Sequence, residues 1–327
     1  MPMLEVNKLS VRLQTQRGPA DAIRGVSFGL QRGDTLGLVG ESGCGKSITA
    51  MALMGLLPEG AAVSGSIRFD GEELVGQSDA AMRKLRGNRI GMIFQEPMTA
   101  LNPVHTIGHQ VAEPMRLHRG ATRALARAQT IALLERVGIA NAAGRVDAYP
   151  HQFSGGQRQR ITIAMALACE PDLLIADEPT TALDVTIQGQ ILDLIHDLVT
   201  ERSMALLLIS HDLGVIAQNV ARMMVMYGGS VIESGATAKL FGHRAHPYTR
   251  GLFGARPRLG APQGQRLSTI DGSVPELVDM PPGCSFADRC AWARDFCVAT
   301  RPPATDLGEG HKASCLRLDA VAAGDLS

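Results

Sequence analysis

The feature that most constrains this chain is the glycine-rich segment 40–47, which reads Gly-Glu-Ser-Gly-Cys-Gly-Lys-Ser. It fits the pattern G-x-x-x-x-G-K-[ST] and lies between an apolar run, Thr35–Val39, and a helix-like stretch, Lys46–Leu57. Such a sequence predicts a buried strand, a tight turn and a helix, with the N–H groups of the turn converging on phosphate oxygens. The alternative, a glycine-rich turn that binds nothing, is disfavoured because both flanking elements are present.

The residues of this cradle have separate expected roles. Lys46 is expected to neutralise the β- and γ-phosphates of a purine nucleotide, and the Ser47 hydroxyl to bind Mg²⁺. Cys44 is either an oxidisable thiol, because a helix N-terminus lowers thiol pKa, or a small residue that offers only its backbone N–H; we favour the second interpretation. The full set expected to bind the nucleotide here is Gly40, Glu41, Ser42, Gly43, Cys44, Gly45, Lys46 and Ser47.

The composition agrees with an α/β protein about two domains long. The chain has 327 residues, 45% of them hydrophobic but only 4% aromatic, and 32 basic residues balance 32 acidic ones. A neutral chain has no global field that draws it to nucleic acid, so no nucleic-acid partner is expected. No apolar run reaches the roughly 20 residues of a membrane-spanning helix, and the first residues do not resemble a signal peptide. A role at a membrane is therefore expected to come through a partner protein.

Short apolar runs alternate with helical patterns up to about residue 255, which predicts a largely parallel sheet. Leu173–Asp177 and Ala205–Ser210 are expected to be buried strands like Thr35–Val39, and Gln157–Ala168 is expected to be a helix. We expect a nucleotide-binding domain at 1–255 and a small irregular module rich in proline and cysteine at 256–327.

A segment of about 96–158 separates two parts of the strand pattern and is expected to form a helical subdomain. Within it, Thr122–Val137 predicts an amphipathic helix. Its expected apolar stripe consists of Leu125, Ile131, Leu134 and Val137.

Two acids mark the end of the run Leu173–Asp177. Asp177 is expected to bind Mg²⁺, and Glu178 to act as the general base that polarises the attacking water. Taken alone, two adjacent acids at the end of a strand are as often part of a solvated loop as of a metal site. After a phosphate cradle, the metal-site interpretation is the stronger one.

The segment Ser154-Gly-Gly-Gln157 begins a predicted helix. Its pattern is a capping box, in which Ser154 caps the helix and Gln157 reaches back to the cap. A capped helix start with glycines also favours anions, so this segment is a candidate site for a second phosphate group.

In order along the chain, these motifs and three others resemble those of ATP-binding cassette (ABC) ATPases. Phe153–Gln157 is similar to the ABC signature, with Phe in place of the usual Leu, and Ile93-Phe-Gln95 is similar to the Q-loop. Ala182-Leu-Asp184 resembles the D-loop, and His211 the switch histidine. The resemblance implies a P-loop NTPase fold with a mixed, largely parallel sheet and a helical subdomain.

The resemblance also implies roles for single residues. Glu178, His211 and Gln95 are implied to be catalytic, with Gln95 sensing Mg²⁺ and the attacking water and His211 contacting the γ-phosphate. Two cassettes are implied to dimerise head to tail around ATP. The implied Mg²⁺ ligands are Ser47, Gln95 and Asp177, the D-loop residue is Asp184, and the residues that serve the partner's ATP are Ser154, Gly155, Gly156 and Gln157.

Further segments resemble the ATPase subunits of bacterial dipeptide and oligopeptide importers: Asn102-Pro103, residues 175–186, His246–Leu252 and the cysteine-bearing tail. What this implies is a peripheral subunit at the cytoplasmic face of the bacterial inner membrane, which hydrolyses ATP to energise peptide import. The implied partners are a second homologous ATPase, two membrane permeases and, indirectly, an extracytoplasmic peptide-binding protein. Another cargo, such as a nickel chelate or a cationic peptide, is the alternative. A soluble non-transport ABC ATPase is disfavoured, since the chain holds one cassette and no coiled-coil insertion.

One position departs from the family pattern. Members usually carry an aromatic residue near the end of the first strand that stacks on adenine, whereas Leu13 holds that place here and residues 11–27 contain no Phe, Tyr or Trp. Adenine is then expected to rest on Arg12, Leu13 or Ala22. Without base–aromatic stacking, nucleotide binding is expected to be weaker and less base-selective.

The tail contains four cysteines in a stretch too poor in apolar residues to build a core alone. It therefore needs a cross-link or a bound metal to stabilise it. Disulfides are disfavoured in a reducing cytosol, and structural zinc usually shows closer cysteine pairs, whereas an iron–sulfur cluster accepts wider spacings. The family resemblance matches the spacing with a [4Fe–4S] site of some peptide-importer ATPases. We expect such a cluster, with zinc or no metal as alternatives, at Cys284, Cys290, Cys297 and Cys315.

Overall fold

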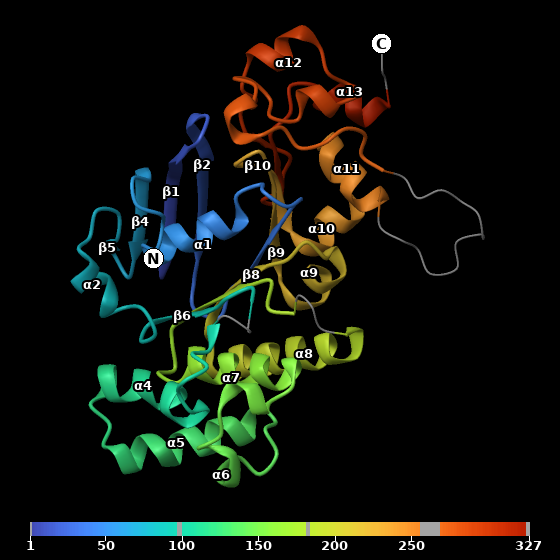
Figure 1. Cartoon of the computed structure of the whole chain (residues 1–327). Helices are drawn as coiled ribbons and strands as arrows, with labels where there is room; N and C mark the ends of the chain where they lie inside the picture. Colours follow the sequence, from blue (N-terminus) through green and yellow to red (C-terminus); the bar gives the residue numbers. More distant parts are fainter. Residues whose placement is uncertain (1, 97–99, 181–183, 256–268, 325–327) are drawn as a thin grey trace. The chain divides into compact units, whose positions relative to one another are not determined.

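The computed structural model describes residues 2–96, 100–180, 184–255 and 269–324 (Figure 1). It divides into two compact units. The first consists mainly of Arg68–Ile209 with Gly29–Thr35, and the second of Glu5–Phe28, Leu36–Ile67 and the chain from Ser210 onward. None of the helices in the described ranges is both long and apolar enough to cross a membrane.

The sheet of the first unit contains three parallel strands, β6 (Ile90–Ile93), β7 (Leu173–Asp177) and β8 (Ala205–Ile209). Every residue of these strands is buried, as continuous apolar runs require in a sheet covered on both faces. The register aligns Ile93 with Ala176 and Asp177 with Ile209. The carboxyl ends of the three strands therefore meet at one edge. β7 has its predicted bounds, and β8 is one residue shorter than predicted.

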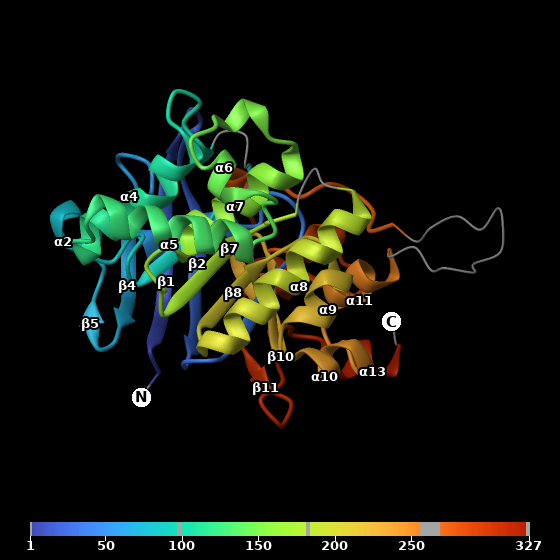
Figure 2. The same cartoon turned by 90° about the horizontal axis from the view of Figure 1, so that it is seen from below.

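Helices α4 (Ile107–Arg119), α5 (Arg123–Arg136) and α7 (Gly155–Leu167) pack against one another, with α6 (Ala142–Arg145) on α5 and α8 (Val185–Arg202) on α7 (Figures 1 and 2). α2 (Asp79–Arg83), η1 (Pro150–Gln152) and the two-residue β5 (Glu72–Glu73) complete the unit. A side-chain oxygen accepts a backbone N–H at the start of each long helix, which satisfies a donor that has no intrahelical partner. These caps are Thr106, Thr122, Ser154 and Asp184.

The buried stripe of α5 differs from the predicted one. The side chains that face the core are Ala126, Thr130 and Leu134, and Val137 follows them, whereas Leu125 is 51% exposed. The assignment of Leu125 to the core is therefore wrong. Ala126 packs against buried residues of α4, and residues four apart share one helix face, so a stripe that contains Ala126 and Thr130 turns Leu125 to solvent.

In the second unit, β2 (Gly18–Leu30), β1 (Leu4–Thr15) and β4 (Ala62–Phe69) lie side by side in that order. In another sheet, β3 (Thr35–Val39) pairs in parallel with β9 (Arg222–Tyr227), which pairs antiparallel with β10 (Ser230–Ala236). The sheet is therefore mixed. β3 continues into the glycine-rich segment and then α1 (Lys46–Met54), as predicted. α1 ends three residues early because Gly55 adopts a left-handed conformation and caps it.

The tail extends this second sheet. β12 (Lys312–Ala313) pairs with β10, so that Glu233 faces Ala313, and β11 (Thr305–Asp306) pairs with β12. The other elements are short helices: α9 (Leu213–Asn219), α10 (Thr237–Gly242), α11 (Pro247–Gly254), η2 (Leu277–Asp279), η3 (Ala287–Arg289), α12 (Asp295–Ala299) and α13 (Leu318–Ala323). The predicted domain boundary near residue 255 adjoins 256–268, which lie outside the described residues.

Candidate nucleotide site

The phosphate loop, residues 40–47, uses glycine where no other residue fits. Gly40 has φ +151°, and a Cβ there would lie 2.2 Å from the carbonyl oxygen of Met226. Gly45 has φ +103°, and its Cβ would lie 2.9 Å from the carbonyl oxygen of Ala22. The backbone therefore turns between β3 and α1 in a space that admits main chain only.

Two features of this loop suit it to phosphate. Gly45 is the N-cap of α1 and offers no side chain to its N–H groups, unlike the Ser, Thr and Asp caps of the first unit. The helix start therefore keeps donors and a positive dipole end for an anion. Lys46 is 6% exposed, and its Nζ donates to the carbonyl oxygens of Gly40 (2.8 Å) and Glu41 (3.1 Å). Its charge is thus held within the loop, next to Ser47.

Cys44 is completely buried. Burial raises the pKa of its thiol, although the charge of Lys46 opposes this effect. A buried, protonated thiol reacts slowly with oxidants. The geometry therefore favours the interpretation of Cys44 as a small loop residue over that of an oxidisable site.

At the carboxyl edge of the first unit's sheet, the structure brings Gln95 and Glu178 together. Asp177 ends β7 and is 4% exposed. Glu178 has φ +46°, its N–H donates to Ile209 (2.9 Å), and its Oε2 accepts from Gln95 Nε2 (3.2 Å). A left-handed conformation is uncommon for a residue other than glycine, and such strain concentrates at functional sites. The backbone thus orients the carboxylate proposed as the general base.

The signature segment forms the predicted capping box. Ser154 Oγ accepts from Gln157 N (3.3 Å), and Gln157 Oε1 accepts from Ser154 N (3.2 Å). Ser154 and Gly155 are exposed, and Gly155 has open space where a Cβ would be. A Cβ on Gly156 would meet Ile187 at 3.0 Å. The tip of α7 therefore presents an exposed, capped and polar helix start.

The remaining motif residues lie at element boundaries. Asp184 caps α8, and its Oδ1 accepts from Thr186 N (3.1 Å) and Ile187 N (3.0 Å); the other two D-loop positions, Ala182 and Leu183, lie outside the described residues. His211 is exposed and follows β8, with Ser210 between them. Its role as the switch histidine stays a prediction.

The residues expected at adenine lie on two strands, Arg12 and Leu13 on β1 and Ala22 on β2. Side chains alternate along a strand, so Arg12 and Leu13 point to opposite faces. Arg12 pairs with Asp21 (Nε–Oδ1 2.7 Å) on an exposed surface. Ala22 is buried, and its backbone carbonyl is the one that closely approaches Gly45. Of the three candidates, Ala22 thus lies next to the phosphate loop.

The four tail cysteines are free thiols that line one cavity of about 20 Å³, together with Phe286 and Trp292. Burial, with a smaller effect of the other three cysteines, raises the pKa of Cys284 to about 11. Among the described residues, no group of three or more His, Cys, Asp or Glu side chains is arranged to hold a metal ion. The expected cluster is therefore not confirmed, although its four thiols share one cavity.

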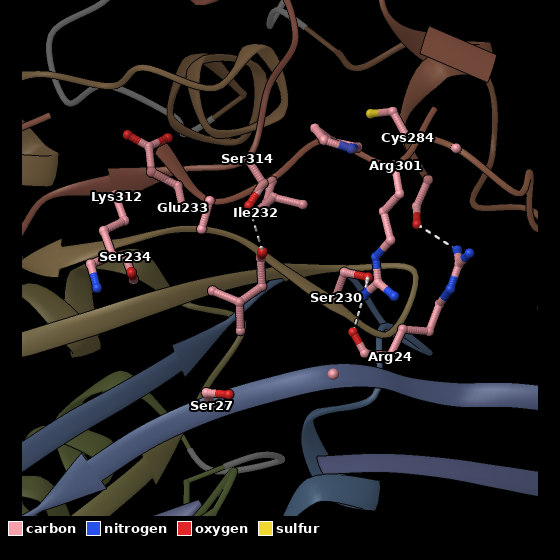
Figure 3. A pocket seen from close by; sticks show the side chains of 16 residues that line it. Arg24, Ser27, Ser230, Ile232, Glu233, Ser234, Cys284, Arg301, Lys312 and Ser314 are labelled. Carbon is pink, nitrogen blue, oxygen red and sulfur yellow. Dashed lines mark hydrogen bonds between the residues drawn. The ribbon is translucent and has the colours of Figure 1, made fainter. Parts of the chain in front are cut away.

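A larger cavity of about 350 Å³ lies elsewhere in the second unit (Figure 3). Basic and hydroxyl side chains line it, including Arg24, Arg301, Ser230 and Ser314, which Figure 3 labels. Arg24 Nη1 also donates to Ser285 Oγ (3.0 Å). None of the residues of the phosphate loop, the acid pair or the signature lines this cavity. Cavity size alone therefore does not identify the nucleotide site.

A strand, a glycine loop with a buried lysine and a helix, together with an acid pair at the end of a buried strand, define a P-loop nucleotide-hydrolysing protein. Comparison with known families narrows this class. Residues 23–181 match the model described as ABC transporter, and residues 232–297 match the model described as oligopeptide/dipeptide transporter, C-terminal region.

Relatives that match over nearly their whole length support the same family. A putative peptide import ATP-binding protein of Brucella ovis is 47% identical over 98% of this chain and 99% of its own length. The dipeptide transport ATP-binding protein DppD of Bacillus subtilis is 48% identical over 99% of this chain and 98% of its own. The post-hydrolysis dimer of the ATP-binding cassette MJ0796, bound to ADP and Pi, is 26% identical, with a TM-score of 0.65 over 72% of this chain and 99% of that one. The chain belongs to the ABC transporter family, as an ATPase with a mixed-sheet P-loop fold.

Proposed function

We propose that this protein is the subunit that hydrolyses ATP to energise import of dipeptides or oligopeptides through an ABC transporter. The observation that carries the peptide assignment is the match of residues 232–297 to the C-terminal region of oligopeptide/dipeptide transporters. The two relatives described above are named for peptide import and for dipeptide transport. Import of another cargo by the same machinery is the alternative, because cargo contacts permease and binding protein rather than this subunit.

In this proposal the phosphate loop holds the triphosphate. The N–H groups of residues 40–47 and Lys46 bind the β- and γ-phosphates, and Ser47 and Asp177 hold Mg²⁺, with Gln95 as a further ligand. The buried carboxylate of Asp177 and a hydroxyl at a helix start are hard oxygen donors, which Mg²⁺ prefers. When bound, Mg²⁺ would neutralise part of the negative charge of the phosphates.

Glu178 is the proposed general base. It accepts the proton of the attacking water, while Gln95, which donates to its carboxylate at 3.2 Å, keeps that carboxylate oriented. His211 donates to the γ-phosphate. The water oxygen forms the new bond to phosphorus, the bond to the β-phosphate oxygen breaks, and ADP leaves with inorganic phosphate.

The exposed start of α7 is proposed to serve the ATP of a second, homologous cassette. Of the segment Ser154, Gly155, Gly156 and Gln157, the two glycines supply backbone N–H groups and Ser154 a hydroxyl that suit a γ-phosphate, while the capping box of Ser154 and Gln157 holds the helix start in place. Two permeases and, indirectly, an extracytoplasmic peptide-binding protein complete the assembly, with this chain peripheral on the cytoplasmic face of the membrane.

For the tail we propose an iron–sulfur cluster held by Cys284, Cys290, Cys297 and Cys315, within a small C-terminal module of about 256–327. The support is that all four thiols line one cavity, with Cys297 buried and the other three half-buried. A bound cluster would supply a covalent staple for a segment with few apolar residues. Protein made anaerobically should carry iron and a brown chromophore that Cys290→Ser loses; stoichiometric zinc in colourless protein would exclude the cluster.

The ATPase assignment is tested with Glu178→Gln in the assembled importer. Loss of the base is expected to lower kcat by about 10²–10⁴-fold while ATP still binds. Lys46→Ala, in contrast, is expected to abolish ATP binding. ATP-dependent uptake of labelled dipeptide by proteoliposomes tests the cargo, and uptake of a nickel chelate but no peptide would favour the alternative.

A further inference from the structure

Glu41, the second residue of the phosphate loop, is held by an arginine of the tail. Arg289 Nη1 lies 2.7 Å from Glu41 Oε2, and Nη2 lies 3.4 Å from Oε1. The side chain of Arg289 is only 6% exposed. A two-point guanidinium–carboxylate pair of this kind fixes orientation as well as charge, and little water screens it.

Arg289 is held on several sides, because its other donors are also bound to acceptors. Nε donates to Asp271 O (2.9 Å), Nη2 to Ile270 O (3.1 Å) and Nη1 to Tyr227 Oη (3.3 Å). With the two bonds to Glu41, all five N–H groups of the guanidinium have an acceptor. The arginine is therefore a fixed point to which the phosphate loop is attached.

Every polar group of Glu41 is engaged. Its N–H donates to Tyr248 Oη (2.9 Å), its carboxylate binds Arg289, and its carbonyl oxygen accepts from Lys46 Nζ (3.1 Å). The rings of Tyr227, Tyr248 and Phe286 pack edge to face, with centroids 4.7–5.3 Å apart. One residue thus connects the tail to the lysine that binds phosphate.

The same turn faces the cysteine cavity. Arg289 ends η3 (Ala287–Arg289), which lies between Cys284 and Cys290, and Phe286 precedes it. Ala287 N donates to Cys284 O (3.0 Å), and Cys290 N donates to Ala287 O (3.2 Å). The position of Arg289 is therefore set by the cysteine segment.

We propose that Arg289 is a positioning residue for ATP, which neutralises Glu41 and fixes the phosphate loop, so that nucleotide affinity depends on the tail. Without this partner, Glu41 would present a negative charge in a loop that must accept negative phosphates, and repulsion would weaken ATP binding. This inference rests on ATP binding by residues 40–47 and adds the tail to the machinery of that site.

The test compares Arg289→Gln, Glu41→Gln and the double variant in the assembled importer. Arg289→Gln is expected to raise the KM for ATP about tenfold with kcat at saturating ATP within about twofold of wild type. The double variant is expected to recover a KM within about threefold of wild type, because it no longer contains the uncompensated charge. Lys239→Met is the matched control: it removes an exposed 2.6 Å pair with Glu309 of the tail and should leave KM unchanged.

A KM for Arg289→Gln within about twofold of wild type overturns the inference, and so does a double variant whose losses simply add. If Arg289→Gln does not fold, Tyr248→Phe replaces it, since the ring stays and only the acceptor for Glu41 N–H is lost. Its KM should rise about threefold with kcat retained, and an unchanged KM overturns the inference. A wild-type importer that neither binds nor hydrolyses ATP would instead refute the proposed function, independently of Arg289.

Discussion

The carboxylate of Glu233 joins three segments of the second unit and should be among the most sensitive positions for stability. Its side chain is completely buried and accepts from Ala245 N (2.7 Å) and His246 N (2.9 Å). His311 Nε2, from the tail, lies 2.8 Å from Oε1. β10, the chain before α11 and the tail are therefore held at one point.

Replacement by Gln leaves the shape almost unchanged but removes the charge. The amide keeps one acceptor oxygen and turns an NH₂ group toward donors, so at least one donor loses its acceptor. A hydrogen bond to a charged group contributes about 1.5–3 kcal/mol, and a buried donor left without an acceptor costs about 1–3 kcal/mol. We expect Glu233→Gln to lower the free energy of unfolding of this region by about 1.5–3 kcal/mol.

Urea denaturation followed by tryptophan fluorescence measures this effect, because the chain has a single tryptophan, Trp292, in the tail. Glu309→Gln is the control: its carboxylate also contacts the cassette, at Lys239, but is 83% exposed, so the loss should be at most about 1 kcal/mol. If Glu233→Gln costs no more than this control, the reasoning from burial is wrong.

Three further predictions concern single sites. Burial lowers the pKa of His246 to about 3, so the unfolded chain binds a proton near pH 6.5 while the folded chain does not, and stability should fall as the pH decreases from 6.5 toward 3. His246→Asn should flatten this pH dependence of the urea midpoint. An unchanged slope would contradict the assignment. Leu13→Tyr should tighten binding of a fluorescent ATP analogue by about threefold or more, and a smaller gain would count against a missing adenine stack. Gly40→Ala should abolish ATP binding, because the added Cβ would lie 2.2 Å from Met226 O; normal binding in titration calorimetry would show that the loop adapts.

Motifs that depend on neighbouring residues could be predicted from the sequence. The strand–loop–helix at 35–54, the buried strand that ends in Asp177 and the capping box of Ser154 and Gln157 all formed at or near their predicted bounds. Hydrophobic periodicity, glycine conformation and helix capping act over a few residues, so the local sequence contains the information. The same local rules failed at Leu125, because the choice of buried face was made by the contact of Ala126 with α4.

Only the tertiary structure decided which distant residues meet. Gln95 and Glu178 are 83 residues apart in the chain, Glu233 and His311 are 78 apart, and Glu41 and Arg289 are 248 apart. No periodicity or spacing connects such pairs, since charged and polar side chains of these types occur at many positions. The sequence by itself determined a phosphate-binding ATPase and its motifs; the fold determined that a tail arginine neutralises the acid of its phosphate loop, because only a folded chain brings the two within hydrogen-bond distance.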